Sequence, residues 1–66
     1  MMNNLKVIRT SKGLSQFGLA KIADITPADL SRIENGKIYA YPNWRKRISK
    51  ALEMPENEIF PDESVI

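Results

Sequence analysis

Basic side chains dominate most of this 66-residue sequence, and their natural chemistry is the binding of anions. All ten Lys and Arg residues lie within residues 1–50, where three acids oppose them and leave a net charge of +7. Residues 51–66 hold five acids and no base, a net charge of −5. A concentrated positive field attracts a polyanion even when the total charge is only +2. Charge alone leaves two interpretations open: a nucleic-acid partner, or a soluble domain whose basic part pairs with its acidic end.

The side chains that most enzymes and metal sites rely on are missing. The sequence has no Cys and no His, which removes disulfides, the usual zinc ligands, and the commonest nucleophile and acid–base group. The glycines at positions 13, 18 and 36 are too scattered to form a phosphate-binding loop. We therefore expect no enzymatic activity, no metal and no cofactor.

Length and hydropathy favour one soluble domain. The longest apolar run is residues 38–41, far below the roughly 18 residues of a membrane span, and no segment resembles a signal peptide. A chain of 66 residues has room for one small domain. We expect a cytoplasmic protein with an ordered core at about residues 3–61 and an acidic tail at 62–66.

Capping signals divide the chain into five short helices. Ser15 and Thr26 are candidate N-caps, and Pro27 suits the first position of a helix. Gly13 and Gly36 suit the turns that end helices. The helices are expected at about 3–12, 16–23 and 27–34, followed by a fourth helix that Pro42 opens and a last short helix that Pro55 starts and Pro61 stops.

The spacing of apolar residues gives each helix one inward face and predicts an all-α fold. The inward positions are Leu5, Ile8 and Arg9 in the first helix, Leu19, Ala20 and Ala23 in the second, Leu30 and Ile33 in the third, and Trp44, Ile48, Ala51 and Leu52 in the fourth.

The helices at 16–23 and 27–34 are separated by about three residues, which is the outline of a helix-turn-helix. Ala20 is small where the two helices cross, and Ile25 can fill the turn. Asp24 stands where we expect a left-handed backbone, which Gly accepts freely and Asp tolerates.

The chain resembles the Cro and phage-repressor type of helix-turn-helix domain, the XRE family. The segments that carry the resemblance are GLSQ at 13–16, LA at 19–20, LSRIENGK at 30–37, RISKAL at 47–52 and NEIF at 57–60. Asp24 replaces the usual turn Gly of the family, and Phe17 occupies a position that is usually polar. The resemblance implies a compact five-helix, lambda-repressor-like domain that acts as a sequence-specific transcriptional regulator on double-stranded DNA.

The resemblance also assigns roles to residues. The recognition helix, at about 27–34, would lie in the major groove with Thr26, Ala28 and Arg32 facing the bases. Arg32 is the best candidate for reading a guanine, although a solvated surface arginine is the alternative, and Thr26 is also explained by capping. Phosphate contacts are expected from Gln16, Ser31, Asn35, Lys37, Tyr39, Asn43, Arg45 and Lys46, and an internal salt bridge from Arg9 and Glu34.

One recognition helix makes few base contacts, so we expect a homodimer, at least on a palindromic operator. Ile59 and Phe60, or Val65 and Ile66, are candidate contacts between the two copies.

A protein-interaction module, such as an antitoxin or the partner of a regulator, is the alternative function for the same fold. The basic residues Lys37, Arg45 and Lys46 favour DNA as the ligand. A binding role for Phe17 and for the acidic tail would favour a protein ligand instead.

Overall fold

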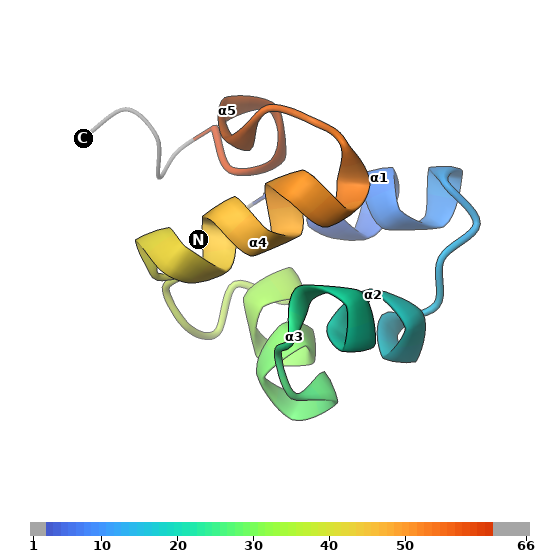
Figure 1. Cartoon of the computed structure of the whole chain (residues 1–66). Helices are drawn as coiled ribbons and strands as arrows, with labels where there is room; N and C mark the ends of the chain where they lie inside the picture. Colours follow the sequence, from blue (N-terminus) through green and yellow to red (C-terminus); the bar gives the residue numbers. More distant parts are fainter. Residues whose placement is uncertain (1–2, 62–66) are drawn as a thin grey trace.

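Residues 3–61, the part of the chain that the computed structural model describes, form five α-helices joined by turns and loops (Figure 1). No strand occurs within this range, and the expected all-α fold with a helix-turn-helix is confirmed. The acidic tail expected at 62–66, with Val65 and Ile66, lies outside the described residues. The helices are α1 (Leu5–Ser11), α2 (Gln16–Ala23), α3 (Pro27–Glu34), α4 (Pro42–Leu52) and α5 (Glu56–Ile59).

Side-chain caps fix where α2 and α3 begin. The Ser15 hydroxyl accepts a hydrogen bond from the Gly18 amide at 2.9 Å, and the Thr26 hydroxyl accepts one from the Asp29 amide at 3.2 Å. Pro27 occupies the first position of α3, where the backbone N–H that proline lacks would have no partner within the helix. Both helices therefore start at the residues that the sequence predicts.

A left-handed residue ends α2 and closes the turn of the helix-turn-helix. Asp24 adopts φ 56° and ψ 49°, and the Ile25 amide then donates to the Ala20 carbonyl at 3.0 Å. Gly13 and Gly36 adopt the same region after α1 and α3, with φ of 73° and 70°. The turn thus places an aspartate in a conformation that is easiest for glycine.

The two terminal helices are shorter than the sequence indicates. α1 begins at Leu5, with Asn4 as its N-cap, and Asn3 lies outside the helix, where its Oδ1 accepts from the Leu5 amide at 3.0 Å. The Asn3 Nδ2 also donates to the Ile33 carbonyl, at 2.8 Å, which holds the start of the chain against α3. At the other end, Pro55 is the N-cap of α5 and Phe60 follows its last turn.

One apolar core receives side chains from all five helices. Ala20 is 2% exposed where α2 packs against α3, and Ile25 is 7% exposed in the turn, as expected of both. Trp44 and Ala51 only border the core, so the prediction that they are core residues was partly wrong. The buried apolar residues are Leu5, Leu19, Ala20, Ala23, Ile25, Leu30, Ile33, Ala40, Ile48, Leu52, Ile59 and Phe60.

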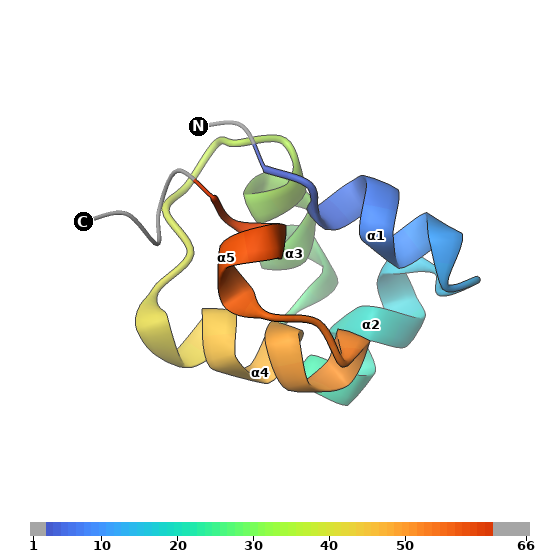
Figure 2. The ribbon, with the colours of Figure 1, turned by 90° about the horizontal axis from the view of Figure 1, so that it is seen from above.

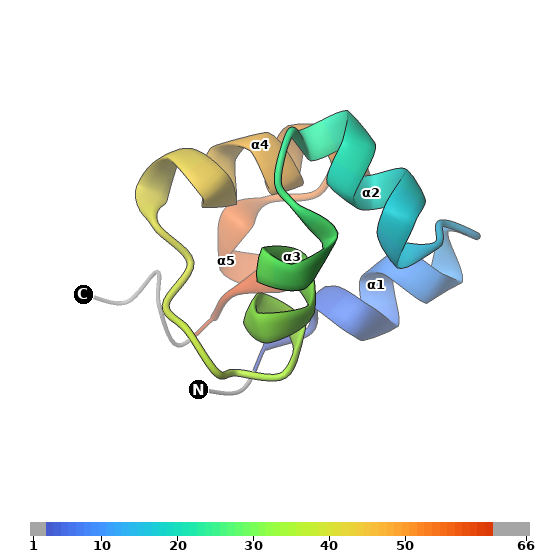
Figure 3. The same cartoon turned by 90° about the horizontal axis from the view of Figure 1, so that it is seen from below.

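The packing leaves α3 on the outside of the domain. α2 packs against both α3 and α4, and α4 packs against α5. α3 lies on the opposite side of the domain from α5, which is in front in the view from above (Figure 2), whereas the view from below has α3 in front with α2 beside it (Figure 3). No helix within residues 3–61 is long and apolar enough to cross a membrane.

Candidate nucleic-acid interface

The three residues predicted to face bases share the start and the outer side of α3. Thr26 and Ala28 are exposed, and the Arg32 side chain is 60% exposed. Arg32 Nη1 lies 3.5 Å from Asp29 Oδ1, an ion pair one turn apart on the helix surface. An exposed pair of this kind is weak, so the guanidinium can exchange its partner for another acceptor at little cost.

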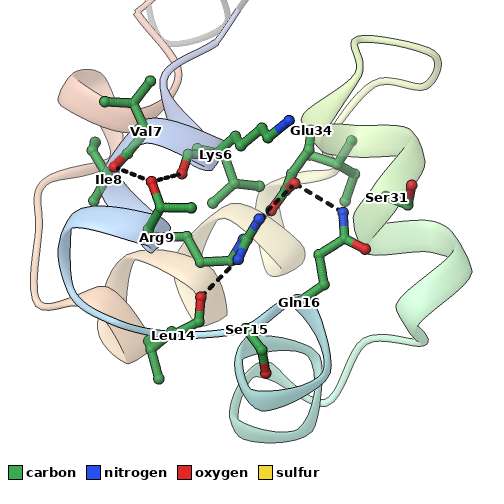
Figure 4. Close-up of polar contacts among 12 residues, drawn as sticks. Lys6, Val7, Ile8, Arg9, Leu14, Ser15, Gln16, Ser31 and Glu34 are labelled. Atoms are coloured by element: carbon green, nitrogen blue, oxygen red, sulfur yellow. Dashed lines mark hydrogen bonds and ion pairs between the residues drawn. The ribbon is translucent and has the colours of Figure 1, made fainter.

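A buried polar network holds the inner side of α3 in place (Figure 4). Arg9 Nε lies 2.5 Å from Glu34 Oε2, and the two side chains are 8% and 1% exposed. Arg9 Nη1 donates to the Leu14 carbonyl at 2.6 Å, and Gln16 Nε2 donates to Glu34 Oε1 at 2.9 Å. The last residue of α3 is therefore bonded to α1 and to the first residue of α2, and Arg9 ties the loop after α1 to the same network.

Gln16 has a hydrogen left for a second partner. Its amide nitrogen carries two hydrogens, and the bond to Glu34 uses one of them. The side chain is half-buried, so it reaches both the interior of the domain and its surface. A phosphate contact by Gln16 stays a prediction, and it is compatible with this geometry.

A hollow of about 510 Å³ follows the end of α3 into the next loop. Three of the residues predicted to touch phosphate line it, namely Ser31, Asn35 and Lys37, together with Arg32. Asn35 Nδ2 donates to the Ser31 carbonyl at 2.9 Å, which fixes the amide across the last turn of α3. The hollow therefore brings polar donors next to the residue predicted to read bases.

Arg45 is placed differently from the other predicted phosphate contacts. Its side chain is 12% exposed, with Nη1 donating to the Tyr39 hydroxyl at 2.8 Å and to the Ala40 carbonyl at 2.7 Å. Its Nε lies 3.5 Å from Glu56 Oε1. A direct phosphate contact by Arg45 stays a prediction, and these partners cover most of the side chain.

The start of α4 presents the remaining predicted contacts. Asn43 and Lys46 are exposed, and Tyr39 is half-buried. Tyr41 packs edge-on against Trp44, with ring centroids 5.2 Å apart, and against Tyr39, with centroids 6.0 Å apart. These aromatic contacts give the loop before α4 a defined shape beside the exposed cations.

An apolar groove adjoins the start of α3. Phe17 is 75% exposed at its edge. The groove measures about 700 Å³ and is lined by Phe17, Gly18, Ala20, Lys21, Asp24, Ile25, Thr26 and Pro27.

Several contacts of the site were not found from the sequence. They are the bond from Gln16 to Glu34, the bond from Asn3 to the Ile33 carbonyl, and the contacts of Arg45 with Tyr39 and Glu56. No local sequence pattern indicates these contacts, because each depends on how segments of the chain pack together.

Among solved structures, the restriction-modification controller protein C.AhdI from Aeromonas hydrophila has a similar fold. The two chains are 28% identical and superpose with a TM-score of 0.82 over 86% of each chain. No protein-family model and no curated protein sequence matches this chain. Because most of the chain is covered, the similarity extends well beyond the two helices of the helix-turn-helix.

Proposed function

We propose that this protein is a DNA-binding transcriptional regulator of the XRE type, with α3 as its recognition helix in the major groove. The observation that carries the proposal is the two-sided character of α3. Its outer side exposes Thr26, Ala28 and Arg32, while the Glu34 side chain, 1% exposed, anchors the helix from within. A rigid helix with an exposed arginine suits base reading. The similarity to a controller protein supports the same function.

The phosphate contacts in this proposal come from residues that flank α3. Gln16 lies beside the last residue of α3, Lys37 follows α3 in the sequence, and Asn43 and Lys46 extend the surface along α4. Such contacts set the register of the protein on the duplex, whereas the outer side of α3 selects the sequence.

A homodimer on a palindromic operator completes the proposal. The longest dimension of one domain is 29 Å, which is less than the roughly 34 Å between equivalent major-groove sites one helical turn apart. Two copies are therefore needed to read two half-sites. Ile59 and Phe60, one of the two candidate contacts between the copies, are fully buried within one chain, so that candidate was wrong. Val65 and Ile66, the other candidate, lie outside the described residues.

Selection of bound duplexes from a random DNA pool tests this function. We expect enrichment of a two-fold symmetric motif whose half-sites are centred about 10 base pairs apart. A scrambled version of the recovered motif is the matched control, and it should bind only in the weak, strongly salt-dependent mode. Failure to enrich any motif, with no duplex binding at low salt, would contradict the proposal.

The exposed Phe17 favours a second candidate function, a protein-interaction module. The groove that Phe17 borders runs from α2 to the start of α3 and is mostly apolar. Under our proposal, Phe17→Ser leaves the selected DNA motif unchanged. Two results together would favour the second function: the wild-type chain selects no DNA motif, and it forms a stable protein complex that Phe17→Ser abolishes.

A further inference from the structure

Arg45 sits inside a cage that joins the loop before α4 to α5. Its guanidinium carbon lies 5.3 Å from the centre of the Tyr39 ring, and Nη1 donates both to the Tyr39 hydroxyl and to the Ala40 carbonyl. Glu56, at the start of α5, places a carboxylate 3.5 Å from Nε. These groups belong to the loop or to α5, and they leave little of the Arg45 side chain accessible.

The direction of the bond to Tyr39 determines what its hydroxyl can do. A guanidinium can only donate hydrogen bonds, so the Tyr39 oxygen is the acceptor of this bond. The phenolic hydrogen then cannot point at Arg45 and is directed to another acceptor. Arg45 therefore makes the Tyr39 hydroxyl a donor toward its surroundings, which is the polarity that a phosphate oxygen requires.

We infer that Arg45 is a positioning residue that acts on DNA through Tyr39, and that the Tyr39 hydroxyl is the group that donates to the phosphate. The inference rests on the proposed function and refines it, because both residues were expected to touch phosphate in the same way. Glu56 balances the charge of Arg45 on the side toward α5 and helps to hold the guanidinium in the cage. The exposed cations Lys37 and Lys46 contact phosphates directly.

A double-mutant cycle in DNA binding tests the inference. Tyr39→Phe removes only the hydroxyl and should weaken binding to the selected operator by about tenfold, the effect of one hydrogen bond to a charged group. In an Arg45→Gln background the same change should weaken binding less than about twofold, because the hydroxyl is no longer oriented.

Lys37→Ala supplies the matched control, since Lys37 belongs to the same loop and is exposed. Lys37→Ala should weaken binding equally in the wild-type and Arg45→Gln backgrounds. That result would mean that the coupling is specific to Tyr39 and does not come from a general loss of loop structure. Equal coupling of Arg45 to Lys37 and to Tyr39 would overturn the inference. Additive effects of Tyr39→Phe and Arg45→Gln would also overturn it and assign Arg45 a phosphate contact of its own.

Arg45→Lys keeps the experiment decisive if Arg45→Gln does not fold. Lysine keeps the charge but lacks the planar fork that spans Tyr39, Ala40 and Glu56 at once. The salt dependence of binding should then be retained while the Tyr39→Phe penalty falls below half of its wild-type size; an undiminished penalty contradicts the inference. Absence of DNA binding by the wild-type chain is a separate result, which refutes the proposed function itself.

Discussion

Gln16 donates a hydrogen bond to Glu34, and this bond joins the first residue of α2 to the last residue of α3. The same carboxylate accepts from Arg9, so the two helices of the helix-turn-helix and α1 share one buried acid. A side chain at the start of α2 is thereby bonded to the end of α3, the proposed recognition helix. The network therefore holds α3, which carries Arg32, against the helix that begins with Gln16.

Replacing Arg9 by Ala should destabilise the fold by about 3 to 5 kcal/mol, the usual effect of removing one partner of a buried ion pair. The Glu34 side chain is 1% exposed and would keep the hydrogen bond from Gln16 while losing its compensating charge. Thermal and urea unfolding of the Arg9→Ala, Glu34→Ala and double variants would measure the coupling between the two residues.

Arg32→Ala is the matched control for that experiment. It also removes one arginine from an ion pair, but the pair with Asp29 is exposed and its loss should change the free energy of unfolding by less than about 1 kcal/mol. Equal destabilisation by Arg9→Ala and Arg32→Ala would show that burial of the Glu34 carboxylate does not matter.

Replacing Asp24 by Gly should stabilise the fold by up to about 1 kcal/mol. A left-handed backbone costs most residues about 1 to 2 kcal/mol, and glycine avoids this cost but loses part of the gain to its larger unfolded-state entropy. The substitution also removes the ion pair of Asp24 with Arg47. That pair is 4.0 Å long and the Asp24 side chain is 94% exposed, so its loss should lower the stability little. Asp24→Ala is the control and should destabilise, giving the order Gly, Asp, Ala in unfolding experiments. A lower unfolding midpoint for Asp24→Gly than for wild type would contradict the argument from φ.

The sequence predicts the helix starts of α2 and α3 because their signals are local. Thr26 caps an amide three residues away and Pro27 fixes its own φ, so neither depends on the rest of the fold. Asn3 shows the limit of such reasoning. Its place outside α1 depends partly on a carbonyl thirty residues away in α3, which no local pattern indicates.

The candidate site divides in the same way. The outward direction of Ala28 and Arg32 follows from helical spacing, because Leu30 and Ile33 must face the core. The cage around Arg45 cannot be predicted from helical spacing, because it depends on the path of the loop before α4 and on where α5 packs. Ile59 and Phe60 illustrate a further ambiguity: an apolar pattern predicts burial but does not distinguish a chain's own core from a partner's surface.

Binding to duplex DNA should weaken steeply as salt is raised. Each phosphate that the basic surface neutralises contributes about −0.9 to the slope of log affinity against log salt concentration. Lys46→Ala should weaken binding to all sequences alike and make the slope shallower by about 0.9 per copy of the protein bound. Lys12→Ala removes the same charge from an exposed position after α1, outside the predicted contact set, and should change the slope less. A slope that is flat for the wild-type chain would contradict the role of its basic residues.

The most direct test of α3 as the recognition helix is a binding matrix of wild type, Arg32→Ala and Arg32→Lys against every single-base variant of the selected operator. Arg32 presents several donors in a fixed planar geometry from an exposed position, whereas Ala28 offers only a methyl group. We predict that Arg32→Ala loses about 1 to 3 kcal/mol on the best site and relaxes the preference at one base pair in each half-site. Arg32→Lys should restore general affinity without restoring that preference. A uniform loss across all operator variants would contradict base reading by Arg32 and make it a phosphate contact.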